Sequence, residues 1–259
     1  MGDLGRGVLY PDEQAAFVDL DRHAPGPELA RFVEFYWHVR WNVTEPYETK
    51  VLAHPNVHLV FEEPAPQVYG VNRSLFVRRL EGRGQVLGVK FRPGCFRPFT
   101  DVRVADLADR RVPATEFFGP AVAETCHAVL RADGPAEMVA RTEEFLLPRL
   151  PDPDPVAEEV ADMVERITAR PALFRVDQAA ETLHISTRTL QRMFAEYVGA
   201  SPKWVLRRAR LHEAAARADR GDDVDWAALA DDLGYCDQSH LIRDFTATVG
   251  VPPARYART

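Results

Sequence analysis

The sequence predicts an α+β protein with a sheet-rich N-terminal domain and an all-helical C-terminal domain. Three observations support this fold class. Aromatic and β-branched runs with partial alternation fill residues 32–92, which is typical of strands. Four prolines follow within residues 148–155 and favour an extended spacer, because proline cannot continue a helix. Beyond them the pattern has the period of amphipathic helices. We therefore place the domains at residues 1–150 and 151–259.

Bulk properties indicate a protein of the cytoplasm. The net charge is −7, with 46% hydrophobic and 27% charged residues, as in ordinary globular chains. No apolar run approaches the roughly 18–20 residues that span a bilayer, and no secretion signal is recognised at the N-terminus. Cys95, Cys126 and Cys236 form neither a disulfide framework nor a zinc spacing. We expect no membrane partner, no metal and no cofactor.

The N-terminal domain is predicted to contain several short strands that form a small barrel-like or curled sheet. The expected strands are 33–41, 57–61, 67–71, 76–80 and 85–91, the last two joined through the glycine-bearing turn 81–84. Two helices are expected at 119–131 and 135–147, each with a proline near its first turn, where a missing N–H costs little.

The C-terminal domain is predicted to consist of short helices separated by caps and breakers. The expected helices are 156–169, 176–183, 187–198, 202–218, 226–233 and 238–249, with a turn near 252–256. Asp177 and Ser186 are suited to cap helix N-termini. Helix ends are expected at Gly199, Gly221, Gly234 and Gly250.

Residues 176–194 have the layout of a helix-turn-helix unit. Its second helix is expected to bury Leu190, Met193 and Phe194, which recur with helical spacing. The opposite face carries long hydrogen-bond donors: Arg188, Gln191 and Arg192. A helix that reads bases in a major groove needs this combination of an apolar back and a donor-rich front.

Residues 226–245 repeat the plan, which makes a chance pattern improbable. An Ala-Ala helix is followed by a turn, a capping residue (Asp237) and a helix with Leu241 and Phe245 inward. The outward positions of this second helix are Gln238, Ser239, Ile242 and Arg243.

At these residues the chain resembles the DNA-binding domain of AraC/XylS-family transcription regulators. The resemblance covers about residues 156–258 and is carried by 186–194 and 234–256, with Leu241 where phenylalanine is commoner. It implies two helix-turn-helix subdomains joined by the long helix 202–218, with recognition helices in successive major grooves of double-stranded DNA.

The resemblance also implies the residues that touch DNA. Base contacts carried over by position are Arg188, Gln191, Arg192, Gln238, Ser239 and Arg243. Phosphate contacts are expected from Ser186, Thr187, Lys203, Arg207 and Arg208. For the basic side chains among them, solvation of a helix face is an equally good interpretation.

Charge is sorted unequally between the two units. Residues 186–210 hold six basic side chains against one acidic one, Glu196. Just upstream of the second recognition helix lie five aspartates: Asp222, Asp223, Asp225, Asp231 and Asp232. DNA responds to such local fields, so we predict that the first unit supplies most of the affinity.

The N-terminal domain gives weaker signals. Residues 86–99 resemble a motif of one regulator subgroup whose N-terminal domain is uncharacterised, and the aromatic strands could line an apolar pocket or form ordinary core. His54, His58 and Cys95 form a metal candidate, although strand histidines are usually structural. Cys95 is either an activated thiol or a buried small residue. Cys236, in the turn of the second unit, is expected to be a packing residue. An anionic effector could be bound by Arg92, Arg97 and Arg103.

The leading interpretation is a transcription regulator, not an enzyme, controlled by a small-molecule effector at its N-terminal domain. Two alternatives remain: a constitutive DNA binder with an oligomerisation module, and a thiol-based sensor enzyme that uses Cys95. An enclosed apolar cavity in the first domain would favour the effector. RNA polymerase and a second copy of the chain are the other partners considered.

Overall fold

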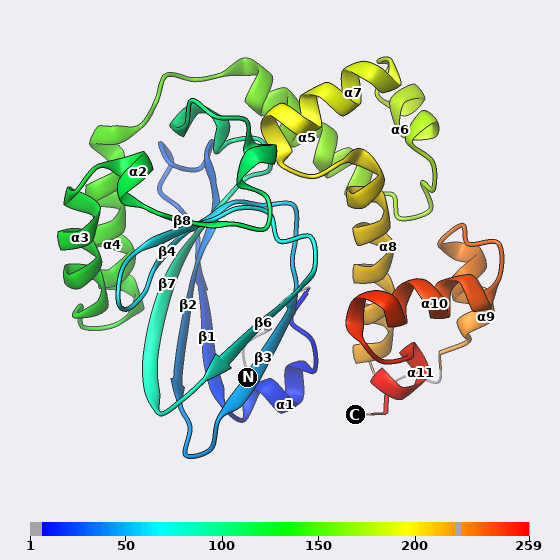
Figure 1. The fold of residues 1–259 in the computed structure, drawn as a ribbon, viewed down its shortest axis with the longest axis horizontal. Coiled ribbons are helices and arrows are strands. Elements are labelled where there is room, and N and C mark those ends of the chain that lie inside the picture. The colour runs from blue at the N-terminus through cyan, green and yellow to red at the C-terminus, as the bar shows by residue number, and fades with distance from the viewer. Residues whose placement is uncertain (1–6, 221–223, 259) are drawn as a thin grey trace.

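The computed structural model describes residues 7–220 and 224–258. They form a sheet-rich N-terminal part and a helical C-terminal part, which confirms the predicted fold class (Figure 1). The described residues leave out Gly221, where a helix end was expected. They also leave out two of the five upstream aspartates, Asp222 and Asp223.

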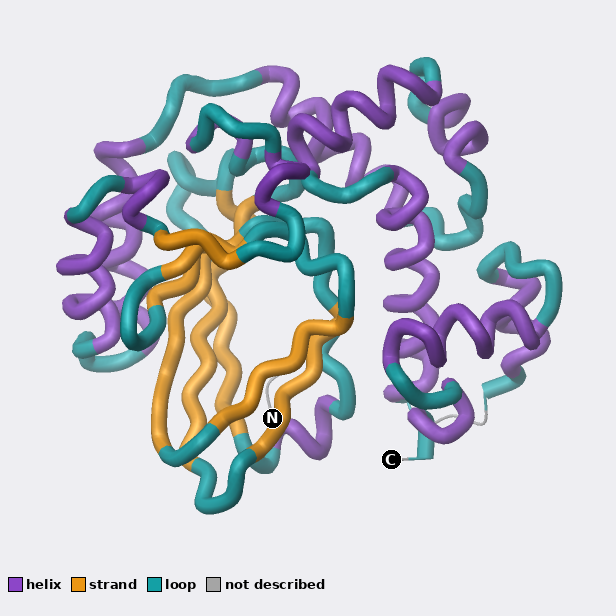
Figure 2. Tube along the Cα trace, in the orientation of Figure 1, coloured by secondary structure: helices purple, strands orange, loops and turns teal. Residues whose placement is uncertain are grey.

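Two antiparallel sheets build the N-terminal part. The larger has the strand order β1-β2-β7-β4-β5-β8, and the smaller pairs β3 with β6. The sheets curl toward each other without joining into a closed barrel (Figure 2). The strands are β1 (Val18–His23), β2 (Val33–Asn42), β3 (Tyr47–Leu52), β4 (His58–Phe61), β5 (Gln67–Tyr69), β6 (Leu75–Leu80), β7 (Arg83–Phe91) and β8 (Arg111–Pro113).

The two strands expected on either side of the turn at 81–84 belong to different sheets. β6 pairs with β3, whereas β7 pairs with β2 and β4. The turn, with Gly82 at φ 56°, leads the chain from one sheet into the other. Strands β1, β3 and β8 were not predicted, because charged residues interrupt them or because they are only three residues long.

Helices cover the outer face of the larger sheet. Tyr36, Leu59, Phe61, Leu87 and Val89 point to that face and are buried in one cluster with side chains of α3 and α4. The helices of this part are α1 (Pro11–Ala15), α2 (Thr115–Phe118), α3 (Ala121–Leu130) and α4 (Pro135–Leu146), with 3-10 turns η1 (Arg97–Phe99), η2 (Val104–Leu107) and η3 (Leu147–Arg149).

The C-terminal helices agree with the predicted ones to within one or two residues, apart from a change of helix type. The helix that begins at Thr187 is α-helical to Met193 and continues as a π-helix, η4 (Phe194–Val198). The α-helices of this part are α5 (Pro155–Thr168), α6 (Val176–Thr182), α7 (Thr187–Met193), α8 (Pro202–Asp219), α9 (Trp226–Asp232), α10 (Gln238–Val249) and α11 (Pro253–Tyr256).

The two parts share hydrophobic clusters. Phe91 and Phe96 pack in the same cluster as Val160 of α5 and Phe194 of η4, the continuation of α7. A second cluster joins Leu9 and Leu52 to the second unit. The sheets are therefore docked on both units through buried apolar surface.

Glycines on β7 make room for two tryptophans on β2. The register sets Trp37 opposite Gly88 and Trp41 opposite Gly84. A Cβ at either glycine would overlap the indole ring across the strand pair. The indoles therefore lie low over β7, where a larger residue would push them away from the sheet.

We predict that Gly88→Ala destabilises the fold by about 1–3 kcal/mol through overpacking, measured by urea unfolding. The effect requires the indole of Trp37. Gly88→Ala made in a Trp37→Ala background should therefore lower the free energy of unfolding clearly less than it does in the wild type. An equal cost in both backgrounds would show that the clash is not with Trp37.

Candidate nucleic-acid interface and ligand cavity

The first helix-turn-helix unit comprises α6, a tight turn and α7. His184 takes the left-handed conformation in the turn, at φ 57°. Ser186 then caps α7, its side chain accepting a hydrogen bond from the Thr189 amide at 3.1 Å. The half-buried Ile185 packs against the core cluster and anchors the turn.

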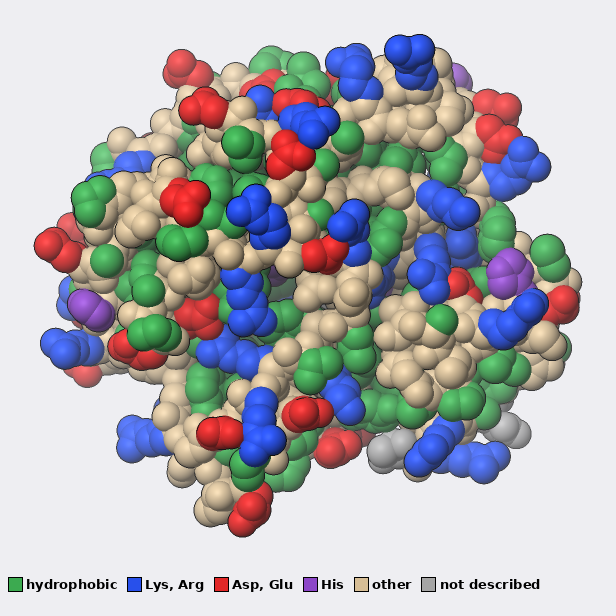
Figure 3. Space-filling view, viewed as in Figure 1, with side chains coloured by type: hydrophobic (Ala, Val, Ile, Leu, Met, Phe, Trp, Pro, Cys, Tyr) green, Lys and Arg blue, Asp and Glu red, His purple; other side chains and the backbone are tan. Residues whose placement is uncertain are grey.

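The α7 surface has the predicted two-sided layout. Leu190, Met193 and Phe194 are buried. The three residues expected to read bases are exposed to solvent: Arg188, Gln191 and Arg192. Figure 3 shows Lys and Arg side chains on the upper right of the molecule, over this unit.

The second unit has the same construction. Asp237 caps α10 by accepting from the His240 amide at 2.7 Å, and Leu241 and Phe245 are buried. The expected base contacts of this helix are exposed as well: Gln238, Ser239 and Arg243. Ile242, which was expected to face outward, is half-buried.

The expected phosphate contacts fall into two groups. Ser186 and Lys203 are exposed, and Thr187 is half-buried. Arg207 instead pairs with Asp244 of α10, and it donates to Thr248 at 3.1 Å. This ion pair ties α8 to the second unit and occupies the guanidinium that was expected at DNA.

Arg208 lies in the contact between the two parts of the chain and not on the surface. It is 3% exposed, and its Nη2 donates to the carbonyl oxygen of Arg73 at 2.8 Å. Its guanidinium also stacks on Trp204, 4.5 Å from the ring centre. Burial, and to a lesser degree Arg207, lowers the Arg208 pKa to about 10. A count of charges along the chain misses such burial.

A cavity of about 730 Å³ lies between the two sheets, and α5 and α8 complete its wall. Its lining follows the period of two along the strands. β2 contributes Phe35, Trp37, Val39 and Trp41, while Tyr36 and His38 between them are buried on the opposite face of the strand. Val164 of α5 and Val205, Arg208 and His212 of α8 close it.

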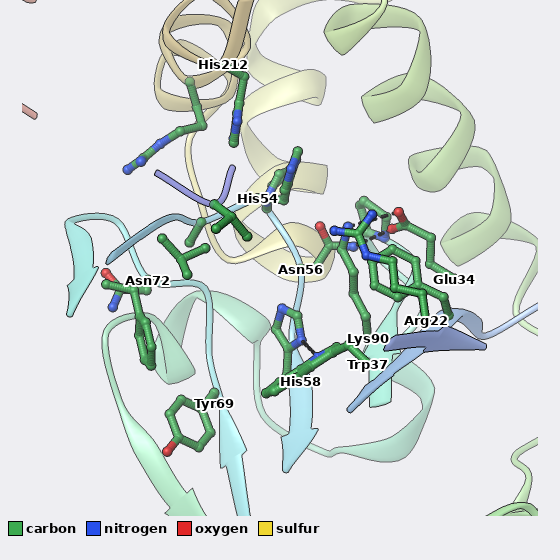
Figure 4. A pocket seen from close by; sticks show the side chains of 18 of the residues that line it. Arg22, Glu34, Trp37, His54, Asn56, His58, Tyr69, Asn72, Lys90 and His212 are labelled. Atoms are coloured by element: carbon green, nitrogen blue, oxygen red, sulfur yellow. Dashed lines mark hydrogen bonds and ion pairs between the residues drawn. The ribbon is translucent and has the colours of Figure 1, made fainter. Parts of the chain in front are cut away.

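One end of the cavity is polar. Lys90 is 7% exposed, its ammonium donates to Glu34 at 2.9 Å, and it lies 4.7 Å from the centre of the Phe35 ring. Arg22 lies at the same distance from that ring. Figure 4 shows Arg22, Glu34 and Lys90 gathered beside Asn56 and Trp37.

His58 is held in one tautomer at this polar end. Trp37 donates its indole N–H to Nδ1 of His58 at 3.0 Å. An acceptor Nδ1 in a neutral imidazole leaves the proton on Nε2. Burial, then the charges of Lys90 and His54, lowers the His58 pKa to about 3, so the ring is neutral at physiological pH.

The other N-terminal candidates do not converge on one site. His54 stacks on His212, with ring centres 4.0 Å apart, while Cys95 is buried with its sulfur near the Ala157 carbonyl. Within residues 7–220 and 224–258, no three His, Cys, Asp or Glu side chains are grouped to hold a metal ion. Each of the three expected anion-binding arginines has a carboxylate partner: Arg92 with Asp162, Arg97 with Glu196 and Arg103 with Asp106.

Sequence reasoning missed Lys90, Glu34 and Arg22. A signal for Lys90 was present, because it is a charged residue inside the otherwise apolar run 86–91. Cys236, expected to be a packing residue, is exposed. Among the described helices, none is both long and apolar enough to cross a membrane.

Comparisons with known proteins match the two parts separately. Residues 21–113 match a domain of unknown function (DUF6597), and residues 179–259 match a family described as a helix-turn-helix domain. A curated Streptomyces lividans protein named as an AraC-like transcription regulator is 33% identical over 105 residues, which is 40% of this chain. The match spans 34% of that protein's length.

Solved structures give distant matches. The C-terminal domain of AraT, a response regulator from Geobacillus stearothermophilus, is 24% identical, with 40% of this chain and 85% of that one covered at a TM-score of 0.35. ToxT from Vibrio cholerae O395 is 10% identical, with 93% and 96% covered at 0.40. ToxT with bound unsaturated fatty acid is 10% identical, with 99% and 97% covered at 0.38. By these matches, the C-terminal part is similar to helix-turn-helix domains and to an AraC-like transcription regulator, and the N-terminal part is similar to a domain family without assigned function.

Proposed function

We propose that this chain is a sequence-specific DNA-binding transcription regulator whose DNA-binding part is controlled by a small molecule held between its sheets. The match to an AraC-type helix-turn-helix domain supports DNA binding. The observation that carries control by a ligand is the cavity, because α5 and α8 of the C-terminal part form one of its walls. A bound molecule would therefore contact both parts at once.

For DNA recognition we propose base contacts from the exposed donors of α7 and α10. Arginine pairs with guanine through two hydrogen bonds and glutamine pairs with adenine in the same way. Phosphate contacts are proposed for Ser186, which caps the first recognition helix, for Thr187, which begins it, and for Lys203 in the first turn of α8. Because DNA is the partner, the proposed site of action is the cytoplasm. Binding to RNA polymerase and to a second copy of the chain remains an expectation from the sequence analysis.

For control we propose that the ligand changes how the N-terminal part holds the helix-turn-helix units. Arg97 pairs with Glu196 of η4 at 2.8 Å, and Gly199 lies against Val104 of η2. The Tyr10 amide donates to the Tyr256 hydroxyl at 3.2 Å in the second unit. A ligand that prefers one arrangement of these contacts shifts the population toward it.

The two units should contribute unequally to DNA affinity. With an operator located by genomic footprinting, Arg192→Ala is expected to weaken binding by about 1–3 kcal/mol, and Arg243→Ala by less, as measured by fluorescence anisotropy. Arg217→Ala, at an exposed α8 arginine paired with Glu213, serves as the control. A larger loss from Arg243→Ala would contradict the predicted dominance of the first unit.

Filling the cavity should abolish the response to an effector. Val86 lies on the inner face of β7, so Val86→Trp places an indole in the cavity. A thermal-shift screen of metabolites should find compounds that raise the Tm of the wild type, as binding to the folded state requires, but not that of Val86→Trp. The same compounds should change operator affinity. Hits that stabilise both proteins equally, or leave operator affinity unchanged, would argue against ligand control.

The thiols should behave as structural groups. Burial raises the pKa of Cys95 and of Cys126 to about 11, so both stay protonated at pH 8, whereas an activated thiol needs a lowered pKa. A disulfide reagent should titrate Cys236 rapidly in the native protein and the other two only after unfolding. Rapid labelling that persists in Cys236→Ser would instead revive a thiol-based sensor.

A further inference from the structure

The inner face of the larger sheet is graded from apolar to polar. Along β2 and β7 the register pairs Val39 with Val86 in the middle of the strands. Further along, Lys90 of β7 lies directly opposite His58 of β4. Leu20, Val60 and Leu80 extend the apolar part of the lining. A ligand that matches this wall has an apolar body and one polar end.

The polar end adjoins the C-terminal helices. His54 stacks on His212 of α8, and Arg92 lies 3.7 Å from Asp162 of α5. Lys90, Asn56 and His58 lie on the same side of the cavity as these helices in Figure 4. The polar group of a ligand oriented by this gradient therefore lies next to the helix-turn-helix part.

Hydrogen-bond donors exceed acceptors at that end. The Lys90 ammonium has three N–H groups, and Glu34 is its one acceptor among the described residues. Both Glu34 oxygens already accept, one from Lys90 and one from Asn56. Nε2–H of His58 has no hydrogen-bond partner in the described chain and points into the cavity (Figure 4). Arg22 adds a second positive charge beside Lys90.

The two donors are spaced to hold one small group. Residues directly opposite on antiparallel strands have Cβ atoms about 5 Å apart. The side chains of Lys90 and His58 can therefore reach the two oxygens of one carboxylate, and a charge-assisted bond to Lys90 is the stronger kind.

From this arrangement we propose that the effector is an apolar molecule with a single anionic group, such as a carboxylate, bound by Lys90 and His58, its apolar body lying along Val39, Val60 and Val86. The proposal rests on the proposed function, because it assigns a ligand class to the same cavity.

Two dyes with one aromatic skeleton test the charge preference. 8-Anilinonaphthalene-1-sulfonate carries an anionic sulfonate, and N-phenyl-1-naphthylamine lacks it. Both report binding to an apolar site by increased fluorescence. We expect the full chain to bind both dyes saturably and the anionic dye more tightly. Val86→Trp, which fills the cavity, is expected to abolish binding of both.

Lys90→Met is expected to weaken the anionic dye about tenfold, equivalent to about 1.4 kcal/mol, and to leave the neutral dye within twofold. His58→Phe should act in the same direction and provides a second variant if Lys90→Met does not fold, as judged by circular dichroism. Lys50→Met is the matched control, because Lys50 lies between Thr49 and Val51, which line the cavity, and so points away from it.

The outcomes separate the two proposals. If Val86→Trp abolishes binding of both dyes but Lys90→Met and His58→Phe leave the ratio of affinities unchanged, the cavity binds ligands and the anionic class is wrong. If neither dye binds in a manner that Val86→Trp abolishes, the ligand site of the proposed function fails together with the anionic class. Selective loss of the anionic dye in both variants supports the anion.

Discussion

The structure depends on how the long helix α8 is buried. Eleven of its eighteen residues are buried, although six of the eighteen are arginine, lysine or histidine. A helix with so many polar residues is usually exposed on one face. Here the N-terminal half of α8 packs in one cluster with the first unit, through Val205 and Leu206, and its C-terminal half packs in another with the second unit. Arg208 and His212 face the cavity of the N-terminal part. The arrangement of all three therefore depends on this apolar packing together with the contacts that the charged side chains of α8 make.

Those charges are accommodated in three different ways. Arg207 has a carboxylate partner, Asp244. Arg210 lies over the ring of Phe174, at 4.1 Å, and donates to a backbone carbonyl. Among the described residues, the partners of Arg208 are carbonyl oxygens and the face of Trp204.

At Arg208, two opposing free-energy terms of similar size act on the docking of the two parts. Removing an ion from water costs several kcal/mol, and hydrogen bonds to a charged group return about 1.5–3 kcal/mol each. The carbonyls that Arg208 uses belong to Arg73 and Ser74, in the loop before β6. If the N-terminal part moves away, the guanidinium regains water and loses these bonds together. Because the desolvation cost and the hydrogen bonds of Arg208 oppose each other, a bound ligand would need to supply little free energy to change this contact.

Much of this architecture could be predicted because helices and caps are local features. Ser186 and Asp237 occupy the cap positions expected from their spacing, and each recognition helix buries the apolar face that its periodicity predicts. The exposure of Arg188 and Arg192 follows from the same period. These features depend on residues fewer than ten positions apart.

The rest could not be predicted because it depends on pairing between distant residues. Lys90 meets Glu34 across a strand pair whose register no local pattern shows. Arg208 and Arg188 are the same residue type on neighbouring helices. Arg208 is buried because the loop before β6, with the carbonyls of Arg73 and Ser74, packs against it, whereas Arg188 is exposed. β6 and β7 likewise look like a hairpin until their partners β3 and β2 are known.

Under the proposed control by a ligand, the position of the cavity favours control of the first unit. Its polar end lies against α5 and α8, and α5 packs on η4, the continuation of the first recognition helix. The same unit is held by Arg97 through Glu196 and by Val104 against Gly199.

A ligand that alters this contact by 1–3 kcal/mol would change DNA affinity by about 5- to 150-fold, and DNA would change ligand affinity by the same factor. Because the first recognition helix carries the longer donors and the more basic surroundings, control of that unit alone would govern most of the binding energy. The unequal charge of the two units and the one-sided placement of the cavity are therefore parts of the same proposed mechanism.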